Sequence, residues 1–155
     1  MIKISVIGKK TRMAALAVVA LGAVLTLGTE VMAHKDKTSA VQQKAFTEAF
    51  MEQVVIGDLL FHGDGATEKK LGVVLSKTGM ACAMCHPWAS DTHPHEYPKY
   101  QSQMGEFAAL RDMINWCIEK PNEGEKINVN GQAMTALEAY IHWSNSGSKL
   151  DPGRF

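Results

Sequence analysis

Apolar residues recur at steps of three and four positions in three separate stretches of the chain. The first stretch runs from Ser39 to about His62, the second from Glu106 to Lys120, and the third from Asn130 to about Asn145. This spacing is typical of a helix that buries one face against a core, so the pattern predicts three amphipathic helices. The inward positions expected on them are Ala45, Phe46, Phe50, Val54, Ile56, Leu59, Leu60, Phe61, Phe107, Leu110, Ile114, Cys117, Met134, Leu137, Tyr140 and Ile141.

Two residues indicate how these helices meet and where the last one begins. Gly57 lowers the helix propensity within the first stretch, and a close crossing with another helix would explain its presence there. Asn130 is expected to cap the last helix, because an asparagine side chain can accept a hydrogen bond from a free N–H of the first turn.

The segments between the helices lack this periodicity. Residues 63–81 are expected to form a connection with one short apolar run, Leu71 to Leu75. Residues 88–103 contain Pro94 and Pro98 and are expected to be irregular. With one further short helix between these two segments, the pattern predicts an all-α domain of about four helices.

That short helix carries the run Cys82-Ala83-Met84-Cys85-His86. Two thiols three positions apart lie on one face of a helical turn, where each can form a thioether with a vinyl group of haem. The histidine that follows can ligate the iron, and Pro87 is expected to end the helix there. A thioredoxin-type pair would need a β-α-β context, and a zinc site would need a second ligand pair; the sequence shows neither. The run therefore predicts an all-α, cytochrome c-like domain around one covalent haem c, held by Cys82, Cys85 and His86.

Residues 1–33 have the three-part layout of a secretory signal peptide. Basic residues such as Lys9 precede an apolar run from Met13 to Gly28, and small residues at Val31 and Ala33 suit a signal peptidase. The apolar run of 16 residues is short for a membrane span, so an uncleaved anchor is the less favoured alternative. The prediction is cleavage after Ala33, which leaves residues 34–155 as a periplasmic monohaem cytochrome c domain.

The net charge of the processed chain limits the kinds of partner that it is expected to bind. Residues 34–155 carry 12 bases against 15 acids, because residues 1–33 hold four of the 16 bases and one of the 16 acids. A net charge of −3 does not favour nucleic acid or an anionic membrane surface as a partner. The expected partners are periplasmic redox proteins, with no membrane span after cleavage. Cys117 then stays as the one spare thiol in an oxidising compartment, which requires an explanation.

The second axial ligand of the iron is open at this point. Met113 and Met134 are expected to fill the core, and the histidines on either side of Pro94 are expected to lie in solvent. Met104 precedes a predicted helix and would suit a His/Met cytochrome, whereas Cys117 could also be an ordinary buried thiol. The candidates downstream of the motif are His93, His95, Met104, Met113, Cys117 and Met134.

Two resemblances extend this interpretation. Gly57 and Phe61 in the first helix, the haem motif, and Tyr140 or Trp143 in the last helix resemble class I cytochrome c, in which the two helices cross at a small residue. Further segments resemble the haem domains of sulfur-oxidising cytochromes, namely the A subunit of the Sox system and the thiosulfate dehydrogenases. They are Ser76-Lys77-Thr78-Gly79, Tyr97-Pro98-Lys99-Tyr100, Leu110-Arg111-Asp112-Met113-Ile114-Asn115-Trp116-Cys117 and Met134-Thr135-Ala136-Leu137-Glu138-Ala139-Tyr140-Ile141.

The narrower resemblance implies that Cys117 ligates the iron, with Met104 as the alternative. A thiolate ligand stabilises ferric iron and lowers the haem potential, whereas a methionine thioether raises it. The leading expectation is single-electron transfer by a protein that is not an enzyme on its own. The alternative is a haem subunit of a complex that oxidises a sulfur compound such as thiosulfate. Coupling sulfur atoms releases two electrons and this chain has one haem motif, so the alternative implies a second cytochrome subunit.

A further interpretation concerns cations near Cys117. Arg111, Lys99 and Lys120 could bind an anion there, but each is expected to be an ordinary surface charge. A haem-based ligand sensor is a third functional class, and the sequence shows no output module to support it.

Overall fold

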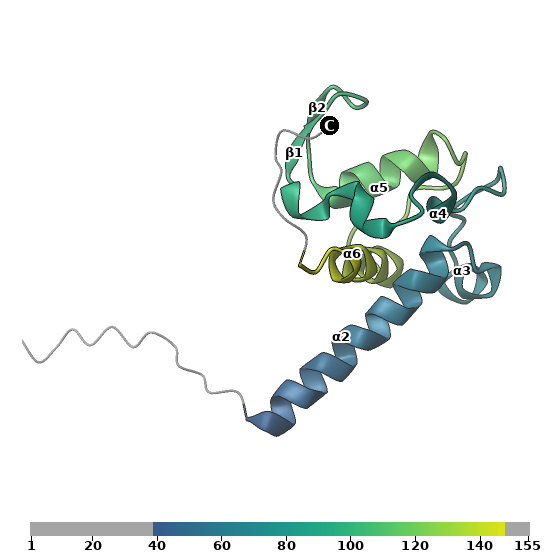
Figure 1. Ribbon diagram of the computed structural model, residues 1–155. Coiled ribbons are helices and arrows are strands. Elements are labelled where there is room, and N and C mark those ends of the chain that lie inside the picture. The colour runs from purple at the N-terminus through teal and green to yellow at the C-terminus, as the bar shows by residue number, and fades with distance from the viewer. Residues whose placement is uncertain (1–38, 148–155) are drawn as a thin grey trace, which may run out of the picture. The chain divides into compact units, whose positions relative to one another are not determined.

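The computed structural model describes residues 39–147, which form one helical unit (Figure 1). The predicted signal peptide, residues 1–33, lies outside the described residues and stays a prediction. The helices are α2 (Ala40–Phe61), α3 (Gly65–Leu71), α4 (Cys82–Cys85), α5 (Leu110–Glu119) and α6 (Gln132–Ser144). Two 3₁₀ helices, η1 (Ala89–Thr92) and η2 (Pro94–Glu96), and a two-stranded antiparallel sheet of β1 (Lys99–Gln101) and β2 (Glu106–Ala108) complete the unit. None of the helices in the described part of the chain is long and apolar enough to cross a membrane.

The first and last helices cross at Gly57, as the pattern predicted. A Cβ atom at Gly57 would lie 2.6 Å from the carbonyl carbon of Ala136 and 2.7 Å from Cβ of Tyr140, which is too close for any side chain. One turn further along α2, the rings of Phe61 and Tyr140 are 5.3 Å apart. Figure 1 shows α2 passing beside α6. The absence of a side chain at Gly57 therefore sets how closely the two helices approach.

The core lies between α2, α5 and α6, and the helices bury much of the predicted face. Leu60, Phe61, Ile118, Met134 and Leu137 are almost completely buried. The N-terminal half of α2 differs, because all residues from 40 to 50 are exposed, Phe46 and Phe50 among them. The apolar stripe predicted for α2 is therefore buried only in its C-terminal half.

The segment 63–81 was predicted to be a connection with one short apolar run, but it contains helix α3. Asp64 caps α3, because its carboxylate accepts a hydrogen bond from the backbone N–H of Thr67 over 2.8 Å. Gly72 ends the helix in the left-handed conformation, at φ 66°, which a glycine adopts without strain. These are start and stop signals that the search for apolar periodicity overlooked, because α3 has no buried residue.

The second predicted helix begins later than expected. Residues 106–108 form β2, which pairs with β1 through a turn containing Gly105 at φ 73°. Phe107 consequently lies on a strand with 70% of its surface exposed, so its assignment to the inward helical face was wrong. Helix α5 starts at Leu110, where the carboxylate of Asp112 accepts a hydrogen bond from the backbone N–H of Ala109 over 2.9 Å.

The last helix begins at Gln132, with Gly131 and not Asn130 at the capping position. The loop before it is held by Asn115 of α5, a buried residue. Its side-chain amide donates to the carbonyl oxygen of Ile127 over 3.0 Å, and its side-chain oxygen accepts from the N–H of Ile127 over 2.9 Å. A single asparagine thereby satisfies both backbone groups of a buried loop residue.

Candidate haem site

A cavity of about 750 Å³ lies between α4, the β1–β2 hairpin, α5 and α6, and its walls are mostly apolar. Its volume is within the range of cofactor sites in proteins. Cys82, Cys85 and His86 contribute to one part of the lining, and Met113 and Cys117 of α5 contribute to another. Residues more than 25 positions apart in the sequence thus meet around one space.

The motif residues occupy the short helix that was predicted for them. Helix α4 spans Cys82–Cys85, and the N–H of His86 donates to the carbonyl oxygen of Cys82 over 2.9 Å. His86 leaves the helical conformation at φ −124° and ψ 76°, which relieves the clash that a helical residue would have with Pro87. The segment leading into the motif is anchored as well, because the N–H of Lys77 donates to the carbonyl oxygen of Asn122 over 2.9 Å.

The ring of His86 has a hydrogen-bond partner that the sequence did not suggest. Nδ1 of His86 lies 3.1 Å from Oδ1 of Asp91, in η1. With Nδ1–H donating to the carboxylate, the lone pair on Nε2 is free to bind a metal. A carboxylate in this position also increases the basicity of a ligating imidazole. The possible signal was an acidic residue five positions after the motif histidine, which is too weak a pattern to read alone.

Cys117 is half-buried in the cavity wall. Burial, with a smaller contribution from Cys85, raises the pKa of the Cys117 thiol to about 11. Burial likewise raises the pKa of the Cys82 thiol to about 11, and the second cause is Cys117. The protein alone therefore favours the neutral thiol at Cys117, and a thiolate there would need a cation such as iron beside it.

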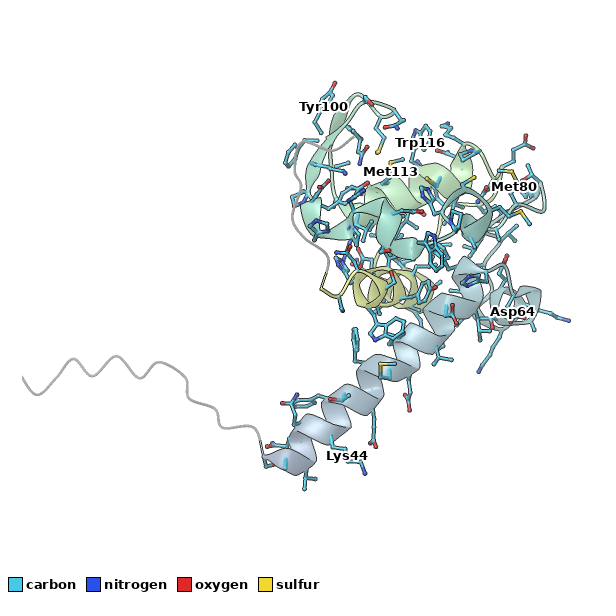
Figure 2. All side chains as sticks on the ribbon, viewed as in Figure 1. Lys44, Asp64, Met80, Tyr100, Met113 and Trp116 are labelled. Atoms are coloured by element: carbon cyan, nitrogen blue, oxygen red, sulfur yellow. The ribbon has the colours of Figure 1, made fainter. Side chains whose placement is uncertain are left out.

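The other candidate ligands fall into different places. Met104 lies in the turn between β1 and β2 and does not line the cavity, and Met134 is fully buried in the core. Met113, which was expected to be core filling, lines the cavity one helical turn before Cys117; Figure 2 shows Met113 on α5. The expectation that His93 and His95 lie in solvent was wrong: both are half-buried, and His93 lines the cavity.

Comparison with known proteins agrees with this arrangement. The model of the SoxA/TsdA cytochrome c domain family matches residues 73–150. The chain belongs to this family. It is also 28% identical over 72 residues to a thiosulfate dehydrogenase from Psychrobacter arcticus, a match that covers 40% of this chain and 21% of the relative. The chain therefore spans about a fifth of the length of that relative.

A SoxA/TsdA cytochrome c domain binds haem c, and the residues in this cavity fit that group. Two thiols at the required spacing, a histidine with a free Nε2 and a further sulfur from α5 surround an apolar space. Haem bound here would supply one-electron chemistry at its iron. If haem binds in this cavity, Cys82 and Cys85 are placed to anchor it, His86 with Asp91 to orient it, and the apolar walls to exclude water.

The three cations considered near Cys117 differ in their availability. The guanidinium of Arg111 donates two hydrogen bonds to the carboxylate of Glu138, over 3.1 and 2.9 Å, and is thereby occupied. Lys120 is exposed next to Glu119, as expected of a surface charge. Lys99 was expected at the surface but is mostly buried; it lines the cavity of this SoxA/TsdA domain, and its ammonium is paired with Glu96 over 3.1 Å.

Proposed function

We propose that this chain is an exported, periplasmic monohaem c-type cytochrome that transfers single electrons. The haem is attached covalently to Cys82 and Cys85, and His86 is its proximal ligand. The observation that carries the proposal is the apolar cavity lined by both thiols and the imidazole. Membership in the SoxA/TsdA cytochrome c domain family supports a haem electron-transfer role.

The proposed second axial ligand is Cys117. Its support is positional, because Cys117 lines the same cavity as His86 whereas Met104 does not. Ferric iron next to the sulfur would offset the desolvation that disfavours the thiolate. His86/Cys117 ligation is expected to give a haem potential well below that of a His/Met cytochrome, because the anionic ligand stabilises the ferric state.

Spectroscopy of the purified protein and a set of variants tests both parts. Haem should stay with the protein through acid-acetone extraction, and mass spectrometry should place it on the peptide containing Cys82 and Cys85. Cys117→Ser should change the ferric spectrum and raise the midpoint potential. Met104→Ala is the matched control and should leave both unchanged.

Two results would contradict this scheme. Haem that is extracted from the wild-type protein would disprove covalent attachment. A near-infrared sulfur-to-iron band typical of methionine ligation, which persists in Cys117→Ser, would disprove thiolate ligation. Met113→Ala and Met104→Ala would then identify the methionine, and Met113 is the one of the two that lines the cavity.

The second candidate function is that of a haem subunit in a complex that oxidises thiosulfate. Two observations favour it: the activity named for the relative from Psychrobacter arcticus, and the presence of Cys117 and the mostly buried Lys99 in the lining of one cavity. The Lys99 ammonium, which is also paired with Glu96 over 3.1 Å, could hold an anionic substrate in this cavity through its charge. Joining two thiosulfate ions through a sulfur–sulfur bond releases two electrons, and one haem accepts only one of them. A second redox centre on a partner protein is therefore part of this proposal.

Anaerobic mixing of the ferric protein with thiosulfate separates the two functions. A pure electron carrier should not be reduced by thiosulfate alone, although it should exchange electrons with a small redox mediator. Reduction by thiosulfate that requires Cys117 and weakens in Lys99→Met, with unchanged mediator kinetics, would favour the thiosulfate-oxidising function. Lys120→Met is the control for a general loss of positive charge.

A further inference from the structure

A group of three potential metal ligands lies in the 3₁₀ segment after the haem motif. His93, His95 and Glu96 each offer one ligand atom, and these atoms all lie within 4.8 Å of one another. His93 joins η1 to η2 in the left-handed conformation, at φ 50° and ψ 54°, which is uncommon for a residue other than glycine. His95 and Glu96 follow it within η2.

The polar atoms of this group are unusual in their lack of partners. Four buried side-chain nitrogen or oxygen atoms have no hydrogen-bond partner within the described residues. Two of them, Nε2 of His95 and Oε1 of Glu96, belong to the group, and a third, Oδ1 of Asn145, belongs to the residue that contacts His95. The Glu96 side chain is only 2% exposed. Burying such atoms without a partner is costly, and coordination of a metal is one way to satisfy them.

The second nitrogen of His95 is held in a way that suits a ligand. Nδ1 of His95 lies 2.8 Å from the side-chain amide nitrogen of Asn145. If the amide turns by half a rotation, Oδ1 of Asn145 accepts from Nδ1–H, and the lone pair of the ring then lies on Nε2. A metal-ligating histidine usually donates its other N–H to an oxygen in this manner.

The carboxylate of Glu96 is divided between two partners in the same way. Oε2 accepts a hydrogen bond from the ammonium of Lys99 over 3.1 Å, which leaves Oε1 for a metal ion. The hydrogen bond from the Lys99 ammonium, together with its charge, holds the pKa of Glu96 below its usual range despite the opposing effect of burial. The carboxylate is therefore ionised at neutral pH, as coordination requires.

We propose that His93, His95 and Glu96 bind a divalent transition-metal ion, with Zn²⁺ as the best fit among common ions. Two imidazoles and one carboxylate with a fourth position open is a ligand set that Zn²⁺ uses, whereas Ca²⁺ and Mg²⁺ prefer oxygen ligands. Zinc bonds of about 2.1 Å place tetrahedral ligands about 3.4 Å apart, so the three atoms must close by up to about 1.4 Å. Rotation of the side chains can supply that movement. Zinc binding itself does not depend on the proposed electron-transfer function, whereas its predicted effect on the haem potential does.

The position of the site predicts a link to the haem. His93 and Lys99 also line the haem cavity, so the ion would lie at its edge. A nearby positive ion favours the state that holds the extra electron, and bound Zn²⁺ should therefore raise the haem potential. By linkage, the reduced protein should bind Zn²⁺ more tightly than the oxidised protein, by the factor that corresponds to the shift in potential.

Equilibrium dialysis of the haem-loaded protein against buffered Zn²⁺ tests the site. Elemental analysis should give one zinc per haem iron for the wild type. His95→Ala and Glu96→Gln should each weaken zinc binding by at least about 100-fold, because each removes a ligand. His142→Ala, which removes an exposed histidine of α6 outside the group, should bind zinc as the wild type does.

Further variants separate metal binding from folding. Asn145→Asp should keep or strengthen zinc binding, because a carboxylate also accepts from Nδ1–H; Asn145→Ala should weaken it about 10- to 100-fold. Each variant must retain the Soret spectrum and far-ultraviolet circular dichroism of the wild type to be counted. Zinc binding that is equal in the wild type, His95→Ala and Glu96→Gln would overturn the proposal. Failure of the wild-type protein to bind zinc would also overturn the proposal, because the site would then not exist.

Discussion

Replacing Gly57 by alanine tests the contact on which the helical unit depends. The new methyl carbon would lie 2.6 Å from the carbonyl carbon of Ala136 and 2.7 Å from Cβ of Tyr140, and it would be closer still to the carbonyl oxygen of Ala136. Comfortable separations between carbon atoms begin at about 3.5 Å. The two helices must therefore move apart by close to 1 Å, because the obstacle is mainly backbone and cannot rotate away.

The cost follows from what the crossing holds together. Overpacking a core costs about 1–3 kcal/mol, and a gap of 0.5–1 Å already forfeits about a quarter to a half of each contact energy. We take about 3 kcal/mol, since Leu60, Phe61 and Leu137 beside the crossing are almost completely buried and all would lose contacts. Alanine recovers about 1 kcal/mol of helix propensity relative to glycine. The expected loss is about 2 kcal/mol, or about 8 °C in melting temperature for a domain of this size.

Thermal and urea unfolding of the haem-loaded protein, followed by circular dichroism at 222 nm, measures this loss. Gly65→Ala is the matched control, because no atom lies within 4 Å of the position that its new methyl group would take and its φ is not positive. That variant should stay within about 0.5 kcal/mol of the wild type. A Gly57→Ala protein as stable as the wild type would refute the close crossing of α2 and α6.

Three further predictions concern the loop, the proximal histidine and alkaline stability. Asn115→Ala should lower the free energy of unfolding by about 2–4 kcal/mol in urea titrations, because the buried N–H and C=O of Ile127 lose their partners. Asp91→Asn should raise the haem midpoint potential in voltammetry, because it removes a negative charge 3.1 Å from Nδ1 of His86; an unchanged potential would exclude a role for that contact. Burial raises the pKa of Tyr97 from 10.0 to about 12, so the neutral phenol stabilises the fold below pH 10 and this contribution is lost toward pH 12. Tyr97→Phe should flatten the decline in urea midpoint over that pH interval, and an equally steep decline would contradict the assignment.

The sequence by itself determined the features that depend on local order. The spacing of Cys82, Cys85 and His86 predicts a haem site wherever the fold places it, since all three residues belong to one turn and its exit. Helical periodicity located α2 and α6 to within a few residues, because apolar residues recur at helical spacing over several turns of each, although α2 buries only the C-terminal half of its stripe. Gly57 indicated the crossing, because a glycine within a long helix is costly unless its missing side chain is used.

Two elements were predicted wrongly because their sequence signals are short or compete with other signals: the start of α5 and helix α3. The periodic residues Phe107, Leu110 and Ile114 suggested one helix, but pairing between β1 and β2 places Phe107 on a strand. The periodicity search missed helix α3, because that helix has no buried face and is marked in the sequence only by its N- and C-caps.

Only the tertiary structure decided which distant side chains meet. Cys117, Met104 and Met113 all follow the haem motif as sulfur-bearing candidates, with Cys117 preferred and Met113 expected in the core. The fold brings Cys117 and Met113 to the cavity while Met104 stays in the hairpin turn. The contacts of Asp91 with His86 and of Asn145 with His95 depend on side-chain direction in irregular or 3₁₀ segments or at a helix end, where no periodicity exists to read. The haem motif is therefore determined by the order of residues along the chain. Its partners are set by the packing of α5, α6 and the 3₁₀ helices around one cavity.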